Sequence, residues 1–523
     1  MLASLMSSTS SPRSFSILYL MRIRNYQQTL WEQQHMIDLA TSLMDTFMKK
    51  LEAGARIESL EGMPFLAWLN RLSKTYGTSF MVVIVLGYCT QGFRCFPWLA
   101  MSYFFKDDLQ VDPGTMQLLM STANLPMVAK PIYGIISDSV YIKGAHRIPY
   151  LAFAGALQLL SWGLISLHAD ATSSVGVVTG ILTITNMGAA ISEVVNDALV
   201  AEAGKNKEGE LQSFAWLALA TGGLLGNLTG GFALQNITSQ SMFSIFMILV
   251  GAQLLLCLSV SEVSFNLGLP EDTEPAVSQK DLDNVLREKN TLSSMHQQVM
   301  LLKGLLQKPE ILRPLLWFLS SSAIIPGLGS SMFFYQTQHL RLDPSVIGLA
   351  KVVGQLGLLA GSIYYNRFLK KVPLRKLFGS VQILWGLCML SDILLVNRIN
   401  VELGIPDEYF VLGASAFVEA IAQFKILPFM VLLAQLCPSG SEGSLFAFFM
   451  SAQCLAGMMS AYLGVGLASY LHISSGSFDE LPLGIFIEAM FTMLPVLWIN
   501  FIPEDFKEFE ASTQASQHEE QVR

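Results

Sequence analysis

A lysine lies inside the apolar run LPMVAKPIYGIISDS, residues 125–139, between Pro126 and Pro131. Each proline removes a backbone hydrogen-bond donor, which loosens the surrounding helix and frees carbonyl groups. A charged side chain in hydrocarbon is energetically costly, so it usually faces a water-filled cavity or a partner of opposite charge. Two interpretations of Lys130 are open: it binds a negatively charged solute, or it forms an internal ion pair with an acid on a neighbouring helix.

Arg94 is a second cation in an apolar segment. Together with Gln91 and Trp98 it has the spacing i, i+3 and i+7, which places all three on one face of a helix. A guanidinium can bind a carboxylate through two hydrogen bonds, and an indole offers a flat surface to a fused heteroaromatic ring. The alternative is that Trp98 belongs to an interfacial aromatic belt and Gln91 makes a helix-packing hydrogen bond.

Polar residues form one stripe in a later apolar segment, where Asn186, Glu193 and Asp197 are spaced i, i+7 and i+11. A carboxyl group on a membrane-embedded face can bind and release a proton during a conformational cycle. We assign proton coupling first to Glu193 and then to Asp197, which lies nearer the end of its segment and nearer water. Asn186 is expected to contact the solute.

The second half of the chain offers fewer candidates. Glu419 and Gln423 are four residues apart and share a helix face, so we expect them to complete the binding surface. Lys425 points elsewhere, and we expect it to pair with an acid or to extend toward the membrane interface.

The composition places these residues in a membrane. The chain has 523 residues, of which 52% are hydrophobic and 14% charged, and its mean hydropathy is +0.47. A soluble domain carries roughly a quarter charged residues. We therefore expect an integral membrane protein. The net charge of −8 gives no indication of a nucleic-acid partner.

Several kinds of chemistry have no motif in the sequence. The six cysteines form no CxxC pair and no histidine cluster has metal-ligand spacing, so we expect no disulfide framework, metal or cofactor. There is no Gly-x-x-x-x-Gly-Lys-Ser/Thr motif for direct use of ATP. No nucleophile–base pair is visible either, so we do not expect an enzyme.

Twelve apolar stretches are long enough to cross a bilayer. All are expected to be helical, because lipid leaves backbone groups no partner outside the segment. The fold class expected is therefore all-α. The stretches lie near 79–105, 114–137, 149–168, 174–200, 211–234, 241–262, 311–336, 344–366, 374–396, 409–436, 442–470 and 482–502.

Basic residues concentrate on one side of this arrangement. The junctions after spans two, four, six and eight carry most of the lysines and arginines between spans, whereas the opposite junctions carry few. Because basic loops stay in the cytosol, we expect both termini and the central linker to be cytosolic.

The chain also repeats itself. Pro97, Phe104-Phe105 and Asp112-Pro113 at the end of span one return as Pro326, Phe333-Phe334 and Asp343-Pro344 at the end of span seven, an offset of 229 to 231. Two parallel six-helix repeats joined by a long cytosolic linker are how major facilitator transporters are built, with the solute site between the halves.

We therefore divide the chain into five segments. Residues 1–28 are rich in serine and contain no acid, which fits either a transit peptide or a disordered cytosolic tail. Leu292 to Leu306 form an apolar stripe that fits an interfacial helix. The segments are an N-terminal tail (1–78), a six-helix bundle (79–262), a linker (263–310), a second six-helix bundle (311–502) and an acidic tail (503–523).

Seven stretches of sequence resemble the folate-biopterin transporter family, most of all its plant branch. The resemblance covers about residues 70–503. The stretches are GYCTQGF (87–93), LPMVAKPIYGIISDS (125–139), KGAHRIPYL (143–151), EVVNDALVAEAG (193–204), LQSFAWLALATGG (211–223), GSIYYNRFLKKVPLRKLF (361–378) and LCPSGSEGSLFAFFMS (436–451).

This resemblance implies a major facilitator fold and transport of folates, pterins or another small solute, with protons as the coupling ion. Three positions depart from the family pattern. Met127 stands where relatives tend to have tryptophan, Glu193 where they tend to have aspartate, and Gln453 where they tend to have asparagine. These changes lie in the region expected to carry transport, so they bear on the substrate more than on the fold.

Asp138 resembles the acid of the Gly-x-x-x-Asp element between spans two and three of major facilitator proteins. A carboxylate can accept hydrogen bonds from the N–H groups that begin another helix, where negative charge is favoured by ~0.3–1 kcal/mol. By fold analogy that helix is span eleven, which begins near residues 441–443. We expect Asp138, with Arg147 from the same junction, to form an inside gate and not to bind the solute.

The expected function is secondary active transport of a small solute by alternating access. Two alternatives are kept: a non-transporting membrane sensor on the same scaffold, and a transporter of a different small anion. The partners expected are a folate-like or pterin-like molecule and the lipid bilayer, with no nucleic acid and a monomeric state. The membrane is either a plastid envelope or the plasma membrane or another cellular membrane.

Overall fold

The structure is a computed structural model that describes residues 65–140, 147–167, 174–204, 210–260, 307–369, 372–436 and 442–504, together with residues 142, 145, 300 and 304. The predictions for residues 1–28, for the stripe at 292–306 and for the tail after residue 504 lie outside this part. The chain divides into a unit at Met1–Thr75 and a unit at Tyr76–Arg523. Helix α2 (Phe65–Tyr76) falls almost wholly in the first unit, and everything below concerns the second.

Nearly all of the described chain is helical. Ten helices or helix runs in this part are long and apolar enough to cross a membrane. In the N-terminal half (residues 78–260) the helices are α3 (Thr78–Phe93), α4 (Cys95–Tyr103), α5 (Pro113–Ala123), α6 (Leu125–Val128), α7 (Lys130–Ser139), α8 (Ile148–Leu167), α9 (Val175–Gly204), α10 (Glu210–Asn236) and α11 (Ser239–Ser259).

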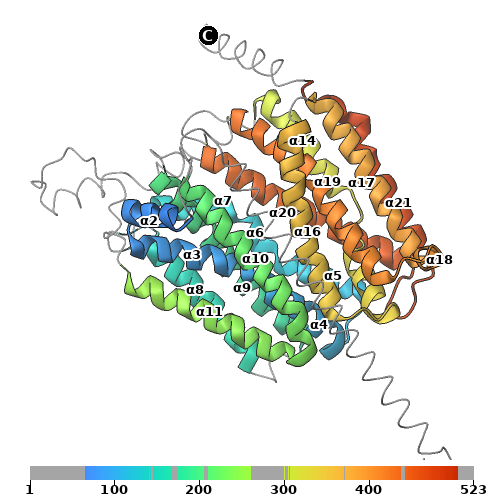
Figure 1. Cartoon of the computed structure of the whole chain (residues 1–523), viewed down its shortest axis with the longest axis horizontal. Helices are drawn as coiled ribbons and strands as arrows, with labels where there is room; N and C mark the ends of the chain where they lie inside the picture. The colour runs from blue at the N-terminus through green and yellow to red at the C-terminus, as the bar shows by residue number, and fades with distance from the viewer. Residues whose placement is uncertain are drawn as a thin grey trace, which may run out of the picture. The chain divides into compact units, whose positions relative to one another are not determined.

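The C-terminal half (residues 307–504) repeats this order. Its helices are α14 (Pro309–Ala323), α15 (Gly329–Phe334), α16 (Pro344–Tyr364), α17 (Leu374–Val396), α18 (Ile399–Glu402), α19 (Asp407–Leu436), α20 (Glu442–Tyr470) and α21 (Leu481–Met493), followed by a 3₁₀ segment at Leu494–Phe501. In Figure 1 the blue to green helices of the N-terminal half and the yellow to red helices of the C-terminal half form two groups.

The two expected spans missing from the ten are both interrupted. The stretch 114–137 is divided into α5, α6 and α7, with breaks at Asn124 and Ala129. Each break is followed two residues later by a proline, which cannot donate the next helical hydrogen bond. The stretch 311–336 is divided into α14 and α15 by residues 324–328. Ten helices or helix runs and two more strongly interrupted spans are consistent with the predicted twelve.

The internal repeat extends to backbone irregularities. A π-helical turn at Phe104–Asp108 ends the first span, and one at Tyr335–His339 ends the seventh. Each is followed by a non-glycine residue with positive φ: 50° at Gln110 and 55° at Arg341. Such a conformation is uncommon outside glycine, so its recurrence at the same offset of 231 confirms the repeat found in the sequence.

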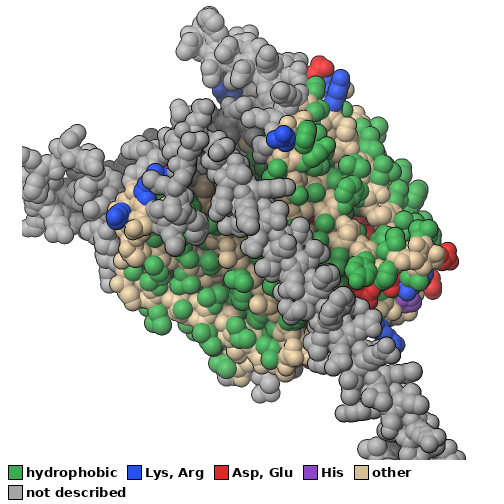
Figure 2. Space-filling view, viewed as in Figure 1, with side chains coloured by type: hydrophobic (Ala, Val, Ile, Leu, Met, Phe, Trp, Pro, Cys, Tyr) green, Lys and Arg blue, Asp and Glu red, His purple; other side chains and the backbone are tan. Residues whose placement is uncertain are grey.

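The outer surface of the helices is apolar, as a lipid-facing surface must be. On α11, the side chains of Ile248, Leu255 and Leu258 are 67–68% exposed. Figure 2 shows hydrophobic side chains spread across the described surface, with charged side chains near its ends. Exposed residues of this kind are a liability in water and suit a hydrocarbon environment. The chain is a multi-pass membrane protein.

The two halves approach each other most closely along α10 and α16. A Cβ atom built on Gly231 would lie 2.8 Å from the Pro344 carbonyl oxygen, and one on Gly348 would lie 2.8 Å from the Asn227 carbonyl oxygen. Glycine is therefore required at both positions for the backbones to touch. Both contacts lie near the helix ends that carry Asp343, which we call the Asp343 end. The other end of the helices is called the Arg147 end.

One glutamine makes three hydrogen bonds between the halves at the Asp343 end. Gln117 of α5 donates from Nε2 to the carbonyl oxygens of Gly327 (2.7 Å) and Ala461 (2.8 Å), and its Oε1 accepts from the Ser330 N–H (3.1 Å). Gly327 lies in the interruption between α14 and α15 and Ser330 lies just after it, so Gln117 satisfies backbone groups that the interrupted helix leaves free. Gln117 thus joins the two halves at the Asp343 end.

Candidate functional site

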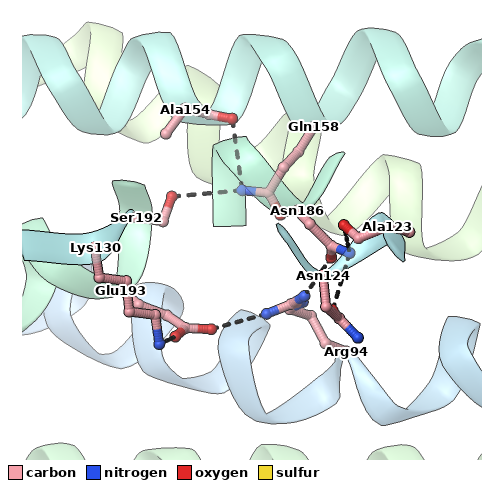
Figure 3. A network of polar contacts seen from close by, with 9 residues as sticks. All are labelled: Arg94, Ala123, Asn124, Lys130, Ala154, Gln158, Asn186, Ser192 and Glu193. Carbon is pink, nitrogen blue, oxygen red and sulfur yellow. Dashed lines mark hydrogen bonds and ion pairs between the residues drawn. The ribbon is translucent and has the colours of Figure 1, made fainter. Parts of the chain in front are cut away.

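Three ionisable side chains meet inside the N-terminal half. Nη1 of Arg94 lies 2.8 Å from Oε1 of Glu193, and Nζ of Lys130 lies 2.6 Å from Oε2 of the same carboxylate. Their side chains are only 12–15% exposed. Figure 3 shows the carboxylate between the two cations. We call these three residues the ion triad.

Helix interruptions position both cations. Arg94 stands at the junction between α3 and α4, and Lys130 is the first residue of α7, directly after the break at Ala129. Glu193 comes from α9, which is continuous over its 30 residues. Pro126 and Pro131 therefore bend the second span at the point where Lys130 reaches Glu193 of α9. This explains why two prolines flank the lysine.

Asn186 links the triad to the first break. Its Oδ1 accepts from Nη2 of Arg94 (2.9 Å), and its Nδ2 donates to the Ala123 carbonyl oxygen (2.7 Å) and to Oδ1 of Asn124 (3.1 Å). Ala123 and Asn124 are the residues where α5 ends. The Ala123 carbonyl is one that helix termination leaves without a helical partner. Asn186 thus fixes the guanidinium and caps the interrupted helix at once (Figure 3).

The charge of the triad is unbalanced. Two cations face one carboxylate, which leaves one net positive charge in a low-dielectric region. Burying an ion is costly unless it is paired and hydrogen-bonded. An anionic group would therefore find two hydrogen-bond donors and an excess of positive charge in place.

A cavity of about 10 Å³ adjoins the triad. That is roughly the space one water molecule needs. Two of its polar atoms, Oγ1 of Thr90 and Oε1 of Gln91, are buried and make no hydrogen bond. The remaining lining consists of Gly87, Arg94, Gln158, Ala189, Ser192, Glu193 and Gln253.

The triad faces the C-terminal half through α20. Cys454 of that helix packs against Met127 of α6 and against Ala189 and Ala190 of α9, the helix that carries Glu193. Next to it, the Ser451 hydroxyl donates to the Val128 carbonyl, a group freed by the break at Ala129. The ion triad therefore lies at the contact between the two halves.

The other predicted site residues have different surroundings. Asp197, one turn after Glu193, is exposed and accepts a 2.6 Å hydrogen bond from the Tyr88 hydroxyl. Trp98 is partly buried on α4. In the C-terminal half Gln423 is buried, while Glu419 packs close to Gly354 of α16. None of these four is joined to the triad by a hydrogen bond or ion pair within the described residues.

Sequence reasoning missed Asn124 and Tyr88. Asn124 precedes Leu125-Pro126 in the middle of an apolar run, and an asparagine there is a signal for a helix break. Tyr88 is spaced i, i+3 and i+6 with Gln91 and Arg94, which places it along the polar face of span one. The spacing of Tyr88 indicated a polar role, but the indication was ambiguous because tyrosine also serves as a core residue.

The predicted gate residues Asp138 and Arg147 form an ion pair of 2.6 Å. Arg147 is buried, also pairs with Glu202 at the end of α9, and donates to the Ser137 hydroxyl at 2.7 Å. The expected contact of Asp138 with the start of span eleven, near residues 441–443, stays a prediction, because residue 441 and the side chains of 442 and 443 lie outside the described part of the chain. Asp138, Arg147 and Glu202 join three helix ends of the N-terminal half.

The prediction for Lys425 was wrong in part. Its side chain does not extend toward an interface: it is 2% exposed, and within the described residues no carboxylate lies within 4.0 Å of it. The same described part contains no cluster of His, Cys, Asp and Glu that could hold a metal ion.

Two interlocking repeats with an ion cluster at their contact define a membrane protein of the major facilitator fold. The structure is similar to that of a D-xylose-proton symporter, with a TM-score of 0.57 and 15% identity over 82% of this chain and 98% of the symporter. It is also similar to a proton-dependent oligopeptide transporter, with a TM-score of 0.55 and 13% identity over 81% and 96% of the two chains.

The chain belongs to the BT1 family, whose model matches residues 91–520. It is 42% identical to the probable folate-biopterin transporter 9, chloroplastic, of Arabidopsis thaliana over 81% of this chain and 77% of that protein. The folate-biopterin transporter of Synechocystis sp. is 30% identical over 81% of both chains. The family predicted from the seven stretches of sequence is confirmed.

Proposed function

We propose that this protein is a secondary transporter that moves folates, pterins or similar small solutes across a membrane by alternating access. The observation that carries the proposal is the ion triad: a buried pair of cations sharing one carboxylate, at the contact between two repeats. The names of the relatives supply the solute class. No enzymatic chemistry is proposed.

The triad suggests how an anionic solute binds. A solute carboxylate can replace Glu193 at the guanidinium of Arg94 and the ammonium of Lys130, because both are strong donors to carboxylates. The displaced Glu193 then loses its counter-charges and takes up a proton, which couples solute binding to proton binding. The remaining solute contacts are assigned to Gln91, Trp98 and Asn186, and across the interface to Glu419 and Gln423.

The contacts at the Asp343 end support an assignment of this conformation as the one closed on that side. Gln117 and the glycine contacts between α10 and α16 separate to admit solute from that side, while Asp138 and Arg147 control the Arg147 end. Asp197 is the secondary proton site. The driving force is the difference in proton concentration across the membrane.

Uptake by vesicles tests the proposal against the alternative of a sensor. The full chain is reconstituted as the sole protein in liposomes, and entry of radiolabelled folic acid and of biopterin is measured with the interior more alkaline than the exterior. A transporter accumulates solute inside the vesicles, and disruption of the vesicles releases it. A sensor binds solute at stoichiometric levels only. A transporter of a different anion moves neither pterin but is stabilised against heat by its own solute.

Replacing Arg94 with lysine is expected to weaken uptake of folic acid. The positive charge remains, but the planar fork that holds Glu193 and Asn186 together is lost. We expect the KM to rise about tenfold, equivalent to ~1.4 kcal/mol of binding free energy, with unchanged abundance in the membrane. Arg398→Lys, at an exposed ion pair with Asp407, is the control. Normal transport by Arg94→Lys would assign the guanidinium a structural role only.

We also propose the five segments given above, with both termini and the linker cytosolic, and a monomer as the working unit. A plastid envelope is the proposed location, because two of the most similar relatives are named chloroplastic. Cysteines introduced near Glu271 and near Ser475 should be labelled from opposite sides of the membrane. Labelling of both from one side would refute the orientation.

A further inference from the structure

The C-terminal half contains a buried cation that the ion triad does not use. Nζ of Lys425 on α19 lies 5.1 Å from the ring centroid of Trp385, 5.3 Å from Phe318 and 5.6 Å from Trp317. Its one hydrogen bond, to the Ser321 carbonyl oxygen, is 3.5 Å long, at the outer limit for such a bond. Aromatic faces attract a cation but do not neutralise its charge.

Lys425 has a counterpart in the other half. Helices α9 and α19 are both 30 residues long and occupy the same place in the two repeats, and Glu193 and Lys425 each lie 18 residues after the first residue of their helix. The repeat therefore sets an acid and a base at equivalent positions. The acid has two partners of opposite charge, whereas the base has none within the described residues.

A second donor near Lys425, the indole N–H of Trp385, lacks an acceptor. The indole N–H of Trp385, the ring that lies nearest the ammonium, is buried and makes no hydrogen bond. Buried donors are normally paired. The Trp385 N–H has no acceptor and the Lys425 ammonium has only the long contact to Ser321, so a ligand with acceptor oxygens and negative charge would satisfy both, and a carboxylate has both properties.

A structural role alone accounts for only part of this arrangement. The Ser321 carbonyl belongs to the last turn of α14, and a helix C-terminus favours a cation. That interaction would explain why a cation is tolerated there. It does not explain why the Trp385 N–H is left without an acceptor, because the end of α14 accepts no hydrogen bond from that N–H.

We propose that Lys425 and the Trp385 N–H form the carboxylate-recognising element of the C-terminal half, which makes the carrier select solutes bearing carboxylates. This rests on the proposed function, because the solute is taken to be the transported one. Arg94 and Lys130 offer donors from one half and Lys425 from the other. A solute with two carboxylates, such as folic acid, can then bridge the halves, while biopterin, which has none, cannot use Lys425.

The test compares the two pterins in vesicles that contain Lys425→Met. Uptake of folic acid is expected to fall about tenfold or more, and uptake of biopterin by less than about twofold, as expected if one charge-assisted contact worth a factor of ten is lost. Lys425→Arg should retain most of the folic acid uptake. Lys351→Met, which removes an exposed lysine of α16, is the matched control. Equal losses for both pterins, or no loss, would overturn the proposal.

A binding measurement separates this proposal from the proposed function. N-benzoylglutamate, which carries carboxylates without a pterin ring, should raise the melting temperature of the wild-type protein and not that of Lys425→Met or Lys425→Gln. If the wild type transports neither folic acid nor biopterin, the proposed function fails. The shift in melting temperature then still shows whether Lys425 recognises a carboxylate. Stabilisation by chloride alone would assign the site to a small inorganic anion. Loss of the folded protein in both variants, with Lys351→Met intact, would make Lys425 structural and overturn the proposal.

Discussion

Replacing Glu193 with glutamine is expected to abolish accumulation of solute driven by a pH gradient while preserving exchange of internal for external solute. Glutamine imitates the protonated carboxyl and cannot release a proton. It also removes the anion that competes for Arg94 and Lys130, so solute binds to both cations without displacing a charge. We expect gradient-driven accumulation to fall at least ~10-fold, a change equivalent to ~1.4 kcal/mol.

Both transport modes are measured in the same vesicles. Glu408→Gln, which makes the same change at an exposed carboxyl in the first turn of α19, is the control. Glu193→Ala should destabilise the protein more than Glu193→Gln, because alanine removes the hydrogen-bond acceptor as well as the charge, whereas glutamine keeps an amide oxygen that can accept from Arg94 or Lys130. Equal loss of exchange and accumulation in Glu193→Gln, or no loss of either, would remove Glu193 as the coupling group.

Substitution of Gly464 by alanine is expected to prevent closure of the Asp343 end. A Cβ atom on Gly464 would lie 1.9 Å from the Gly327 carbonyl oxygen and 2.8 Å from Nε2 of Gln117. The first contact is with backbone that Gln117 already holds, so it cannot move aside cheaply. Forcing extra volume into such a packed site typically costs ~1–3 kcal/mol. The closed conformation should lose population, and transport should fall by about one order of magnitude or more.

Gly466 supplies the matched control on the same helix. A Cβ atom there meets no atom within 4 Å, so Gly466→Ala should transport as the wild type does. An introduced cysteine at Tyr103, which packs against Phe333 across the halves at 5.3 Å between ring centroids, should become more reactive in Gly464→Ala. Wild-type transport and reactivity in Gly464→Ala would show that this contact does not form during the cycle.

The helices and the repeat were predictable because each is visible in short stretches of sequence. Hydrophobic length identifies a span, and the pairs Phe104-Phe105 and Phe333-Phe334 reveal the duplication without any three-dimensional information. The prolines around Lys130 also predicted the interruption of span two. The interruption in span seven was less apparent, since Pro326 alone does not show where α14 ends.

The partners of the charged residues were not predictable to the same degree. The spacing of Arg94 along its helix indicates a face, but not that the face meets Glu193 on α9, 99 residues later. An ion pair between Lys130 and an acid was one of two open interpretations, and it is present. Lys425 illustrates the limit: its neighbours come from α14 and α17, so no pattern on its own helix could show that it is buried among aromatic rings.

Solute counterflow is the most direct test of the central claim that the ion triad serves a carrier. Vesicles containing only this protein are loaded with unlabelled folic acid and diluted into a trace of radiolabelled folic acid, with no ion gradient present. A carrier with the triad as its solute site predicts transient accumulation of label above the equilibrium level, which Arg94→Ala abolishes. Absence of this overshoot with folic acid and with biopterin, or an overshoot that Arg94→Ala leaves unchanged, would contradict the account.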